Sequence, residues 1–285
     1  MNATIRSFFD PATCTATHAV SCPRTGAAAV IDSVLDYEPK SGRTDSASAD
    51  KVLQYLRDNG LTVQWHLETH AHADHFSAAP YLKERVGGRI AIGRHIREVQ
   101  TVFKGIFNAK DMNTEGAQFD HLFEDDEPFR IGELDAHVLH TPGHTPACVT
   151  YAIGGDAFVG DTLFMPDYGS ARCDFPGGDA RVLFRSIRKV LALPPETRLH
   201  LCHDYQPGGR DARWQTTVAE QRGANIHVHD GITEDDFVAM RTARDKTLGM
   251  PALLLPAIQV NVRAGHMPPP EDNGTRYLKI PLNLF

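Results

Sequence analysis

The sequence predicts an α/β fold for a chain of 285 residues. Short apolar segments typical of buried strands alternate with segments whose apolar residues recur at helical spacing. Several of the candidate strands end in turn-rich segments that carry histidine or aspartate. At roughly 150 residues per domain, the length suits either two domains or one large domain. The length alone therefore leaves the number of domains open.

The first half of the chain is expected to form strands that alternate with helices. Residues 27–34 (AAAVIDSV) are apolar and partly β-branched, which indicates a buried strand, whereas residues 34–50 are polar and indicate a loop. A helix over residues 49–59 is predicted by apolar residues on one face, by Ser48 or Asp50 as its cap, and by a glycine stop at residue 60. The following predicted elements are a strand at 61–69, a helix at 77–85, a strand at 89–93 and a helix at 96–107.

The second half begins with a polar, acidic segment, residues 108–129, which we interpret as an insertion over the surface. A strong amphipathic helix is predicted at residues 179–191. Strands are expected at 134–141, 148–153, 157–159 and 199–202, followed by helices near 212–222 and 233–248 and a proline-rich tail.

Composition excludes several classes of protein. The net charge is 29 − 36 = −7, which argues against a general nucleic-acid binder. No segment approaches the roughly 20 apolar residues of a membrane span, and the start of the chain lacks the pattern of a signal peptide. The five cysteines include no CxxC pair, so neither a disulfide framework nor a thiolate zinc cluster is indicated. We expect a cytoplasmic protein with a small-molecule partner.

Histidine carries the functional signal. Residues 69–76 read THAHADHF, which places His70, His72, Asp74 and His75 within six positions. This cluster follows a predicted strand, and ligands bind at the carboxyl ends of strands in α/β sheets. Imidazole and carboxylate suit zinc, iron and manganese. Three further candidate ligands lie in turn-rich segments after predicted strands: His144 in TPGHTP, Asp161 in VGDTLF and His203 in LCHDY. Seven ligands are enough for one metal ion or two.

This ordered set resembles that of the metallo-β-lactamase-fold superfamily, and the resemblance covers residues 27–204. It implies an αββα sandwich with the metal between the ends of two sheets. In the two-metal form of that family, His70, His72 and His144 would hold one ion. The second ion would be held by Asp74, His75 and His203, and Asp161 would bridge the two. The ligands alone do not separate dinuclear zinc hydrolases from mononuclear iron oxygenases.

The segments between the ligands are similar to the persulfide dioxygenases of the ETHE type, in the bacterial β-lactamase-related-hydrolase-like branch. The matching segments are GDTL, the R-x-D-F motif at residues 172–175, PGGDA, the HDY motif and LPAIQVN in the tail. The resemblance implies one Fe(II) per chain, held by His70, His144 and Asp161, with three coordination positions left open. Asp74, His75 and His203 then become catalytic residues that, with His72, orient ligands or move protons.

The activity that this resemblance implies is the oxidation of glutathione persulfide by O2 to sulfite and glutathione, in hydrogen sulfide detoxification. Arg172 is the candidate to bind a glutathione carboxylate, because a guanidinium pairs with carboxylates through two hydrogen bonds. Tyr205 either offers its hydroxyl to the substrate or only packs. Cys173 and Cys202 are expected to be either inert buried thiols or targets of the persulfide.

Two alternatives stay open. A glyoxalase II-type hydrolase of glutathione thioesters would use Zn(II), but Cys173 and Asp174 replace the aromatic residues that follow the basic residue in that family. A non-catalytic binding protein would be favoured by the loss of a ligand. Because the ligands run from His70 to His203, we expect one catalytic domain, residues 1–230, with a short helical and proline-rich C-terminal extension, residues 231–285, packed on it. Residues 96–107 and 253–285 could pair two chains into a homodimer or pack within one chain.

Overall fold

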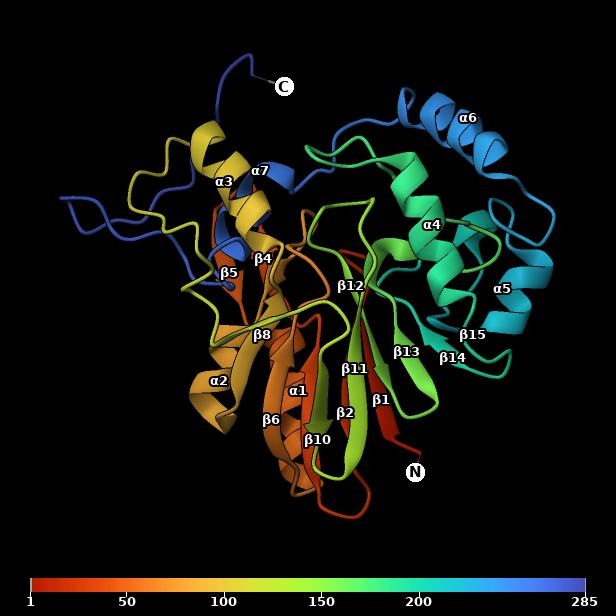
Figure 1. Ribbon diagram of the computed structural model, residues 1–285. Coiled ribbons are helices and arrows are strands. Elements are labelled where there is room, and N and C mark those ends of the chain that lie inside the picture. The colour runs from red at the N-terminus through yellow and green to blue at the C-terminus, as the bar shows by residue number, and fades with distance from the viewer. Residues whose placement is uncertain (1, 285) are drawn as a thin grey trace.

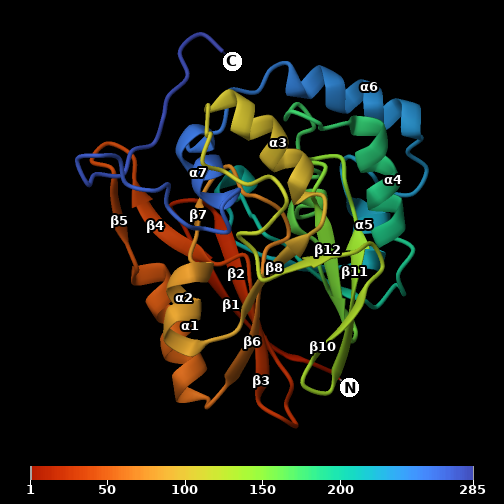
Figure 2. The ribbon, with the colours of Figure 1, turned by 60° about the vertical axis from the view of Figure 1, so that its left-hand side comes forward.

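The computed structural model describes residues 2–284 and contains two six-stranded sheets that pack face to face, with helices on both outer faces (Figures 1 and 2). The predicted α/β fold class and the αββα arrangement are therefore confirmed. The apolar core between the sheets includes Ile31, Leu67 and Phe123 from one sheet and Val138 and Tyr151 from the other.

The first sheet combines an antiparallel half with a parallel half. Its order is β1-β2-β3-β6-β8-β9; pairs are antiparallel from β1 to β3 and parallel from β3 to β9. The helices α1 (Ala47–Asp58) and α2 (Ala79–Val86) cover its outer face through a separate apolar cluster. The strands are β1 (Thr4–Asp10), β2 (Thr15–Ser21), β3 (Ala27–Ile31), β6 (Thr62–Leu67), β8 (Arg89–Gly93) and β9 (His121–Phe123).

The second sheet runs β10-β11-β12-β13-β14-β15 and is antiparallel except for the β13–β14 pair. Helix α4 (Ala180–Val190) packs on its outer face, with α5 (Val218–Ala224) and α6 (Glu234–Asp245) beyond it. The strands are β10 (Pro128–Ile131), β11 (Leu134–His140), β12 (Val149–Ile153), β13 (Asp156–Phe158), β14 (Arg198–His200) and β15 (Gln215–Thr217).

Two helices and a small sheet complete the structure at the end of the sandwich where the histidines lie. Helices α3 (Ile96–Ile106) and α7 (Leu254–Asn261) share an apolar cluster that contains Phe103 and Ile258. The small sheet has the order β5-β4-β7. Its strands are β4 (Val34–Glu38), β5 (Arg43–Asp45) and β7 (Phe76–Ser77), and short 3-10 turns span Gly160–Thr162 and Pro207–Gly209.

Several predicted elements need correction. The predicted strand at 27–34 ends at Ile31, and the predicted loop at 34–50 holds β4 and β5. The insertion at 108–129 contributes β9, which extends the first sheet beside β8. The helix predicted at 212–222 begins only at Val218, because β15 precedes it and Thr217 and Glu220 form a capping box. Helix α1 begins at Ala47, so its N-cap is Ser46. Strands β1 and β2 and helix α7 were not predicted.

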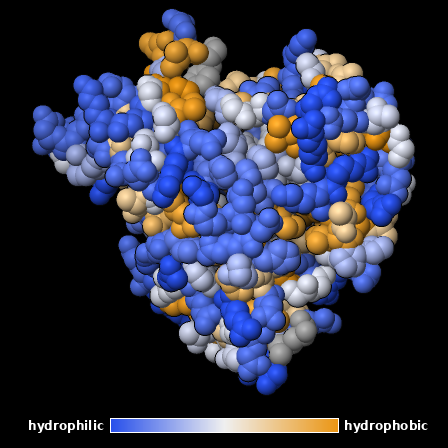
Figure 3. Space-filling view, viewed as in Figure 1, coloured by the Kyte–Doolittle hydropathy of each residue, from blue (hydrophilic) through white to orange (hydrophobic). Residues whose placement is uncertain are grey.

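The segment near the C-terminus exposes apolar side chains. Figure 3 shows hydrophobic residues gathered on the segment that projects at the C-terminus, and Ile280, Leu282 and Leu284 are exposed there. Among residues 2–284, no helix is long and apolar enough to cross a membrane.

Candidate metal centre

The seven predicted ligands come together at one end of the sandwich. Four of them lie in the loop that connects β6 to β7, and the other three follow β11, β13 and β14 of the second sheet. All are buried except Asp74, whose side chain is 25% exposed. Residues from both sheets therefore meet in one polar cluster inside the protein. The ligands are His70, His72, Asp74, His75, His144, Asp161 and His203.

One group consists of His70, His144 and Asp161, whose ligand atoms all lie within 4.8 Å of one another. The Nε2 atoms of His70 and His144 lie 4.0 and 3.7 Å from Oδ2 of Asp161. These distances are too long for hydrogen bonds, yet the three side chains are close enough to share one ion. This is the two-histidine, one-carboxylate set that the family resemblance implies for a single iron.

Each histidine of this group is held through its other ring nitrogen. Nδ1 of His144 donates a hydrogen bond to the backbone carbonyl of Arg172 at 2.8 Å. Nδ1 of His70 lies 3.1 Å from Oγ1 of Thr69, whose hydroxyl donates to Asp32 at 2.9 Å. Partners of this kind fix the tautomer and leave the Nε2 lone pair for a metal. The two imidazoles are therefore oriented before any ion binds.

Gly160 allows Asp161 to approach the histidine loop. Its φ is +51°, and a Cβ atom there would lie 2.6 Å from Oγ1 of Thr69. A side chain at this position would push the turn away from Thr69 and, with it, the Asp161 carboxylate.

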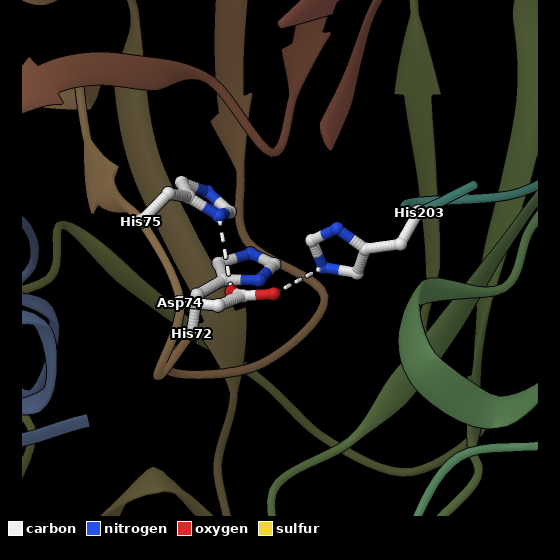
Figure 4. A group of neighbouring side chains, drawn as sticks. All are labelled: His72, Asp74, His75 and His203. Carbon is white, nitrogen blue, oxygen red and sulfur yellow. Dashed lines mark ion pairs between the residues drawn. The ribbon is translucent and has the colours of Figure 1, made fainter. Parts of the chain in front are cut away.

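The second group contains His72, Asp74, His75 and His203 (Figure 4). Figure 4 shows the Asp74 carboxylate between two imidazoles: Oδ1 lies 3.3 Å from Nδ1 of His75, and Oδ2 lies 3.1 Å from Nε2 of His203. Burial alone would raise the pKa of Asp74, but the His203 and His75 imidazoles oppose it and lower the pKa. Asp74 is therefore an anionic carboxylate that lies between two imidazole rings.

His72 is placed differently from the two-metal pattern. Its Nε2 lies 2.9 Å from Oδ1 of the buried Asp32 and 3.4 Å from Oε2 of Glu68. Burial would lower the pKa of His72, but the Asp32 and Glu68 carboxylates reverse this effect and raise the pKa well above its usual range. Nδ1 of His72 makes no hydrogen bond, so this nitrogen, and not Nε2, is the atom that could bind an ion. The ligand atoms of His72 group with those of Asp74, His75 and His203, whereas the two-metal pattern places His72 with His70 and His144.

The donor set fits a cation. Four buried polar atoms of the described ligands make no hydrogen bond: Nδ1 of His72, Nε2 of His75, Oδ1 of Asp161 and Nε2 of His203. Buried polar atoms in proteins nearly always have a partner, and imidazole nitrogen and carboxylate oxygen are the ligands of iron and zinc. The cluster has the chemistry of a metal centre.

Asn261, in α7, was not identified from the sequence. Its buried side-chain amide donates hydrogen bonds to the carbonyls of His72 (2.8 Å) and His75 (2.7 Å) and accepts one from the N–H of Ser77 (2.9 Å). Asn261 thus holds the second half of the histidine loop.

Arg241 and Asp245, in α6, were also missed. They form a buried ion pair at 2.6 Å, and the Asp245 carboxylate accepts the N–H of Cys173 at 2.9 Å. Arg241 donates to the carbonyl of Ser170 at 3.2 Å. His144 is hydrogen-bonded to the carbonyl of Arg172 in the same loop. The Arg241–Asp245 pair therefore supports a metal ligand without being a ligand itself. No local sequence signal points to these contacts, since the partners are far apart along the chain.

A pocket of about 410 Å³ opens onto His70, Asp74, His144 and Asp161. Its wall includes Tyr205, which is 38% exposed and whose ring stacks on His203 at 5.7 Å. Aromatic residues Phe164, Tyr168 and Phe175 and the C-terminal segment at 248–253 complete much of the wall.

Arg172 also lines this pocket, but its guanidinium is engaged within the protein. Nε and Nη2 donate to the two carboxylate oxygens of Asp174 at 2.5 and 2.6 Å, and Nη1 donates to the carbonyl of Gly249 at 2.7 Å. A second arginine at the pocket, Arg244, is exposed and lies over the ring of Tyr168 at 5.9 Å. The sequence did not single out Arg244.

The two cysteines near the centre are buried. Burial raises the pKa of Cys173 and of Cys202 far above the usual thiol range. Both thiols therefore stay protonated and are weak nucleophiles.

Residues 20–203 match the model of the metallo-beta-lactamase superfamily. A probable metallo-hydrolase of Burkholderia pseudomallei is 60% identical over 99% of this chain and 100% of its own length. Glyoxylase B2 of Dictyostelium discoideum is 52% identical over 92% of this chain and 91% of its own. The human mitochondrial persulfide dioxygenase ETHE1 is 28% identical over 93% of this chain and 90% of its own.

Among solved structures, the crystal structure of ETHE1 from Myxococcus xanthus is similar to this one with a TM-score of 0.74. It is 28% identical and covers 92% of this chain and 100% of its own.

Proposed function

Since this chain belongs to the metallo-beta-lactamase superfamily, we propose that it is a persulfide dioxygenase that oxidises glutathione persulfide with O2 at one Fe(II). The product is sulfite, and glutathione is released. The proposal is supported by the similarity to ETHE1 proteins in sequence and in fold.

The observation that carries the proposal is a set of two histidines and one carboxylate. The ligand atoms of His70, His144 and Asp161 all lie within 4.8 Å of one another, while that of His72 groups with Asp74, His75 and His203. A single ion with three protein ligands keeps open positions for small molecules. Fe(II) would supply the redox chemistry that O2 requires and that zinc lacks.

The balanced reaction consumes one persulfide, one O2 and one water, and it gives glutathione, sulfite and two protons. Asp74 lies at the pocket wall, where its partly exposed carboxylate, 3.1 Å from Nε2 of His203, can accept a hydrogen bond from water. We propose that Asp74, His75 and His203 orient this water and pass its protons to solvent during sulfite formation.

The substrate would enter the pocket with its sulfur toward His70 and Asp161 and its peptide portion along the aromatic wall. The aromatic rings of Phe164, Tyr168 and Tyr205 offer apolar contact area. Arg172 stays the predicted carboxylate-binding residue, but binding through it would displace Asp174. Arg244 offers a second guanidinium at the mouth of the same pocket.

The direct test loads the chain with Fe(II) without oxygen and then measures O2 uptake and sulfite formation on addition of glutathione persulfide. We expect uptake of one O2 per sulfite. The absence of uptake, together with cleavage of a glutathione thioester by the zinc-loaded chain, would overturn the proposal.

The second candidate function is a zinc hydrolase of glutathione thioesters, as in glyoxalase II. It is favoured by the names of two more similar relatives, a probable metallo-hydrolase and a glyoxylase. It requires two metal ions per chain, with His72 among their ligands. The metal content of protein purified from unsupplemented cells separates the two candidates, since one iron supports the first and two metals the second.

We propose a cytoplasmic protein without a nucleic-acid or membrane partner. A homodimer is also proposed, with the exposed apolar side chains of Ile280, Leu282 and Leu284 as the first place to test. Deletion of residues 280–285 should then halve the mass measured by light scattering.

A further inference from the structure

A second group of metal-type ligands lies outside the seven residues of the metal centre. It consists of His95 at the start of α3, Asp125 in the 108–129 insertion and His140 at the end of β11. We propose that these three residues bind a divalent transition-metal ion, with Zn(II) as the best match. The proposal is independent of the activity assigned to the first centre.

The spacing of the three side chains suits one ion. Nε2 of His95 lies 3.4 Å from Oδ1 of Asp125, and Nδ1 of His140 lies 3.3 Å from Oδ2 of the same carboxylate. With zinc–ligand bonds of about 2.0–2.1 Å, two ligands of a tetrahedral ion are about 3.3 Å apart. All three ligand atoms lie within 4.8 Å of one another.

The second nitrogen of each ring is already bonded in the way that metal-binding histidines require. Nδ1 of His95 lies 2.7 Å from Oε1 of Glu98, and Nε2 of His140 donates to the carbonyl of Pro146 at 2.9 Å. These contacts place the protons on the far nitrogens and turn both lone pairs toward Asp125. Burial also lowers the pKa of His140, which keeps this ring neutral.

The surrounding charges favour a cation. Two imidazoles face one carboxylate, and Glu98 adds a second negative charge behind His95. The nearby Arg94 is paired with Glu124, and Lys189 donates to the His140 carbonyl at 3.0 Å, on the backbone side. A dication would neutralise the carboxylates without displacing a positive group.

The rings are stacked with their centroids 4.1 Å apart and their planes 7° from parallel. Because an ion must lie near the plane of each ring that binds it, binding turns at least one ring about its Cβ–Cγ bond. The three side chains are 26%, 49% and 17% exposed for His95, Asp125 and His140, which leaves room for this rotation and for water as the fourth ligand.

The cluster gives the 108–129 insertion a role that the sequence alone did not reveal. A bound ion would tie Asp125 of the insertion to His140, and the hydrogen bond from His140 reaches Pro146 in the loop that carries His144. The ion would therefore connect the insertion to the support of the first centre, without a ligand in common.

The test counts bound zinc. The full-length chain is stripped of metal, titrated with Zn(II) by calorimetry, and analysed for zinc by mass spectrometry after desalting. We expect the His95→Ala/His140→Ala chain to bind one zinc fewer than the unchanged chain. The control is His137→Ala, which removes an exposed histidine from the same strand, β11, and should bind as much zinc as the unchanged chain.

A second variant keeps the test decisive if the double variant does not fold, as judged by circular dichroism. Asp125→Asn preserves the shape of the side chain and removes its charge, and it should weaken this zinc-binding step about tenfold or more. Equal stoichiometry and equal affinity in the unchanged chain and in the variants would overturn the proposal. The cluster would then be a carboxylate ion-paired with two imidazoles and nothing more.

Discussion

The carboxylate of Asp245 accepts a hydrogen bond from the backbone N–H of Cys173 at 2.9 Å. This contact joins helix α6 to the loop that contains Arg172 and Cys173. In that loop, the carbonyl of Arg172 orients the ligand His144. The C-terminal extension therefore reaches the metal centre through the backbone of another segment, without providing a ligand itself.

The substitution Asp245→Asn should lower both stability and metal affinity. It leaves the buried Arg241 guanidinium without its anionic partner, and breaking a buried ion pair of this kind costs about 3–5 kcal/mol. Chemical denaturation measures the first effect, and competition with a chelator measures the second.

The double variant Arg241→Met/Asp245→Leu separates these effects. It removes both charges, so most of the stability should return. The backbone N–H of Cys173 loses its acceptor, so the affinity for metal should stay about tenfold or more below that of the unchanged chain. Recovery of metal affinity together with stability would show that the Asp245–Cys173 contact has no positioning role.

Asn261→Asp should loosen the histidine loop. The change retains the acceptor for the N–H of Ser77 but replaces the amide that donates to the His72 and His75 carbonyls with an oxygen that repels them. We expect about tenfold weaker metal binding and an altered visible spectrum of the cobalt-substituted chain. Gln259→Glu is the matched control, because it makes the same chemical change in α7 but contacts Leu255 and Lys279. Equal spectra for the two variants would contradict the prediction.

Asp32→Asn should release His72. Without the carboxylate, the pKa of His72 falls, so the ring loses its proton more readily and its unpartnered Nδ1 becomes a better metal ligand. In excess Zn(II), the variant should bind more metal than its parent. Both chains should carry His140→Ala, so that the surface cluster does not contribute to the count. An unchanged metal count would show that Asp32 does not control the number of ions.

Arg244→Gln should raise KM for glutathione persulfide about tenfold with little change in kcat, because loss of a charge-assisted hydrogen bond to a carboxylate weakens binding by roughly 1.5–3 kcal/mol. Arg57→Gln, an exposed substitution on α1, is the control. The corresponding Arg172→Gln variant should lower kcat as well, since Arg172 also holds its own loop through Asp174 and Gly249. A KM unchanged in the Arg244 variant would remove this residue from the binding site.

Acid should destabilise the fold through the buried His18. Burial lowers the pKa of His18 to about 3, whereas an unfolded histidine titrates near its ordinary value of about 6.5. Above pH 6.5 both states are neutral and the group has no effect. As the pH falls below 6.5, only the unfolded chain takes up the proton, so stability decreases until the pH reaches about 3.

Between pH 6.5 and 5 this single group should remove about 2 kcal/mol. Denaturant unfolding at pH 5 and 7.5 measures the difference. His18→Gln can still bond to Ser7 and to the Leu201 carbonyl and should reduce the pH dependence by that amount. His137→Gln, at an exposed position, should leave it unchanged.

The ligands could be predicted from the sequence because each lies in a short local pattern next to a strand. His70 and His75 sit in one six-residue motif, and Asp161 and His203 follow buried strands directly. The supporting residues could not be predicted in this way. Asn261 contacts the carbonyl of a residue 189 positions earlier in the chain, and its polar side chain in an apolar helix gives no indication of its partner.

The missed strands have a similar physical reason. Strand β2 reads TATHAVS and is buried along its whole length. Its sequence shows neither a regular alternation of polar and apolar residues nor a continuous apolar run. Their burial is explained by partners elsewhere, such as the Leu201 carbonyl that His18 contacts. Helix α7 lies among prolines, and its burial against β7 and α3 outweighs the local signal.

The metal centre takes ligands from both sheets, and this has a consequence for how the protein matures. Synthesis of the chain reaches His70, His72, Asp74 and His75 well before His203. A chain still on the ribosome therefore offers only part of the ligand set. Retention of the ion requires that the two sheets have already docked. Tight metal binding therefore follows the docking of the two sheets, and chains that stop folding halfway do not retain a metal ion.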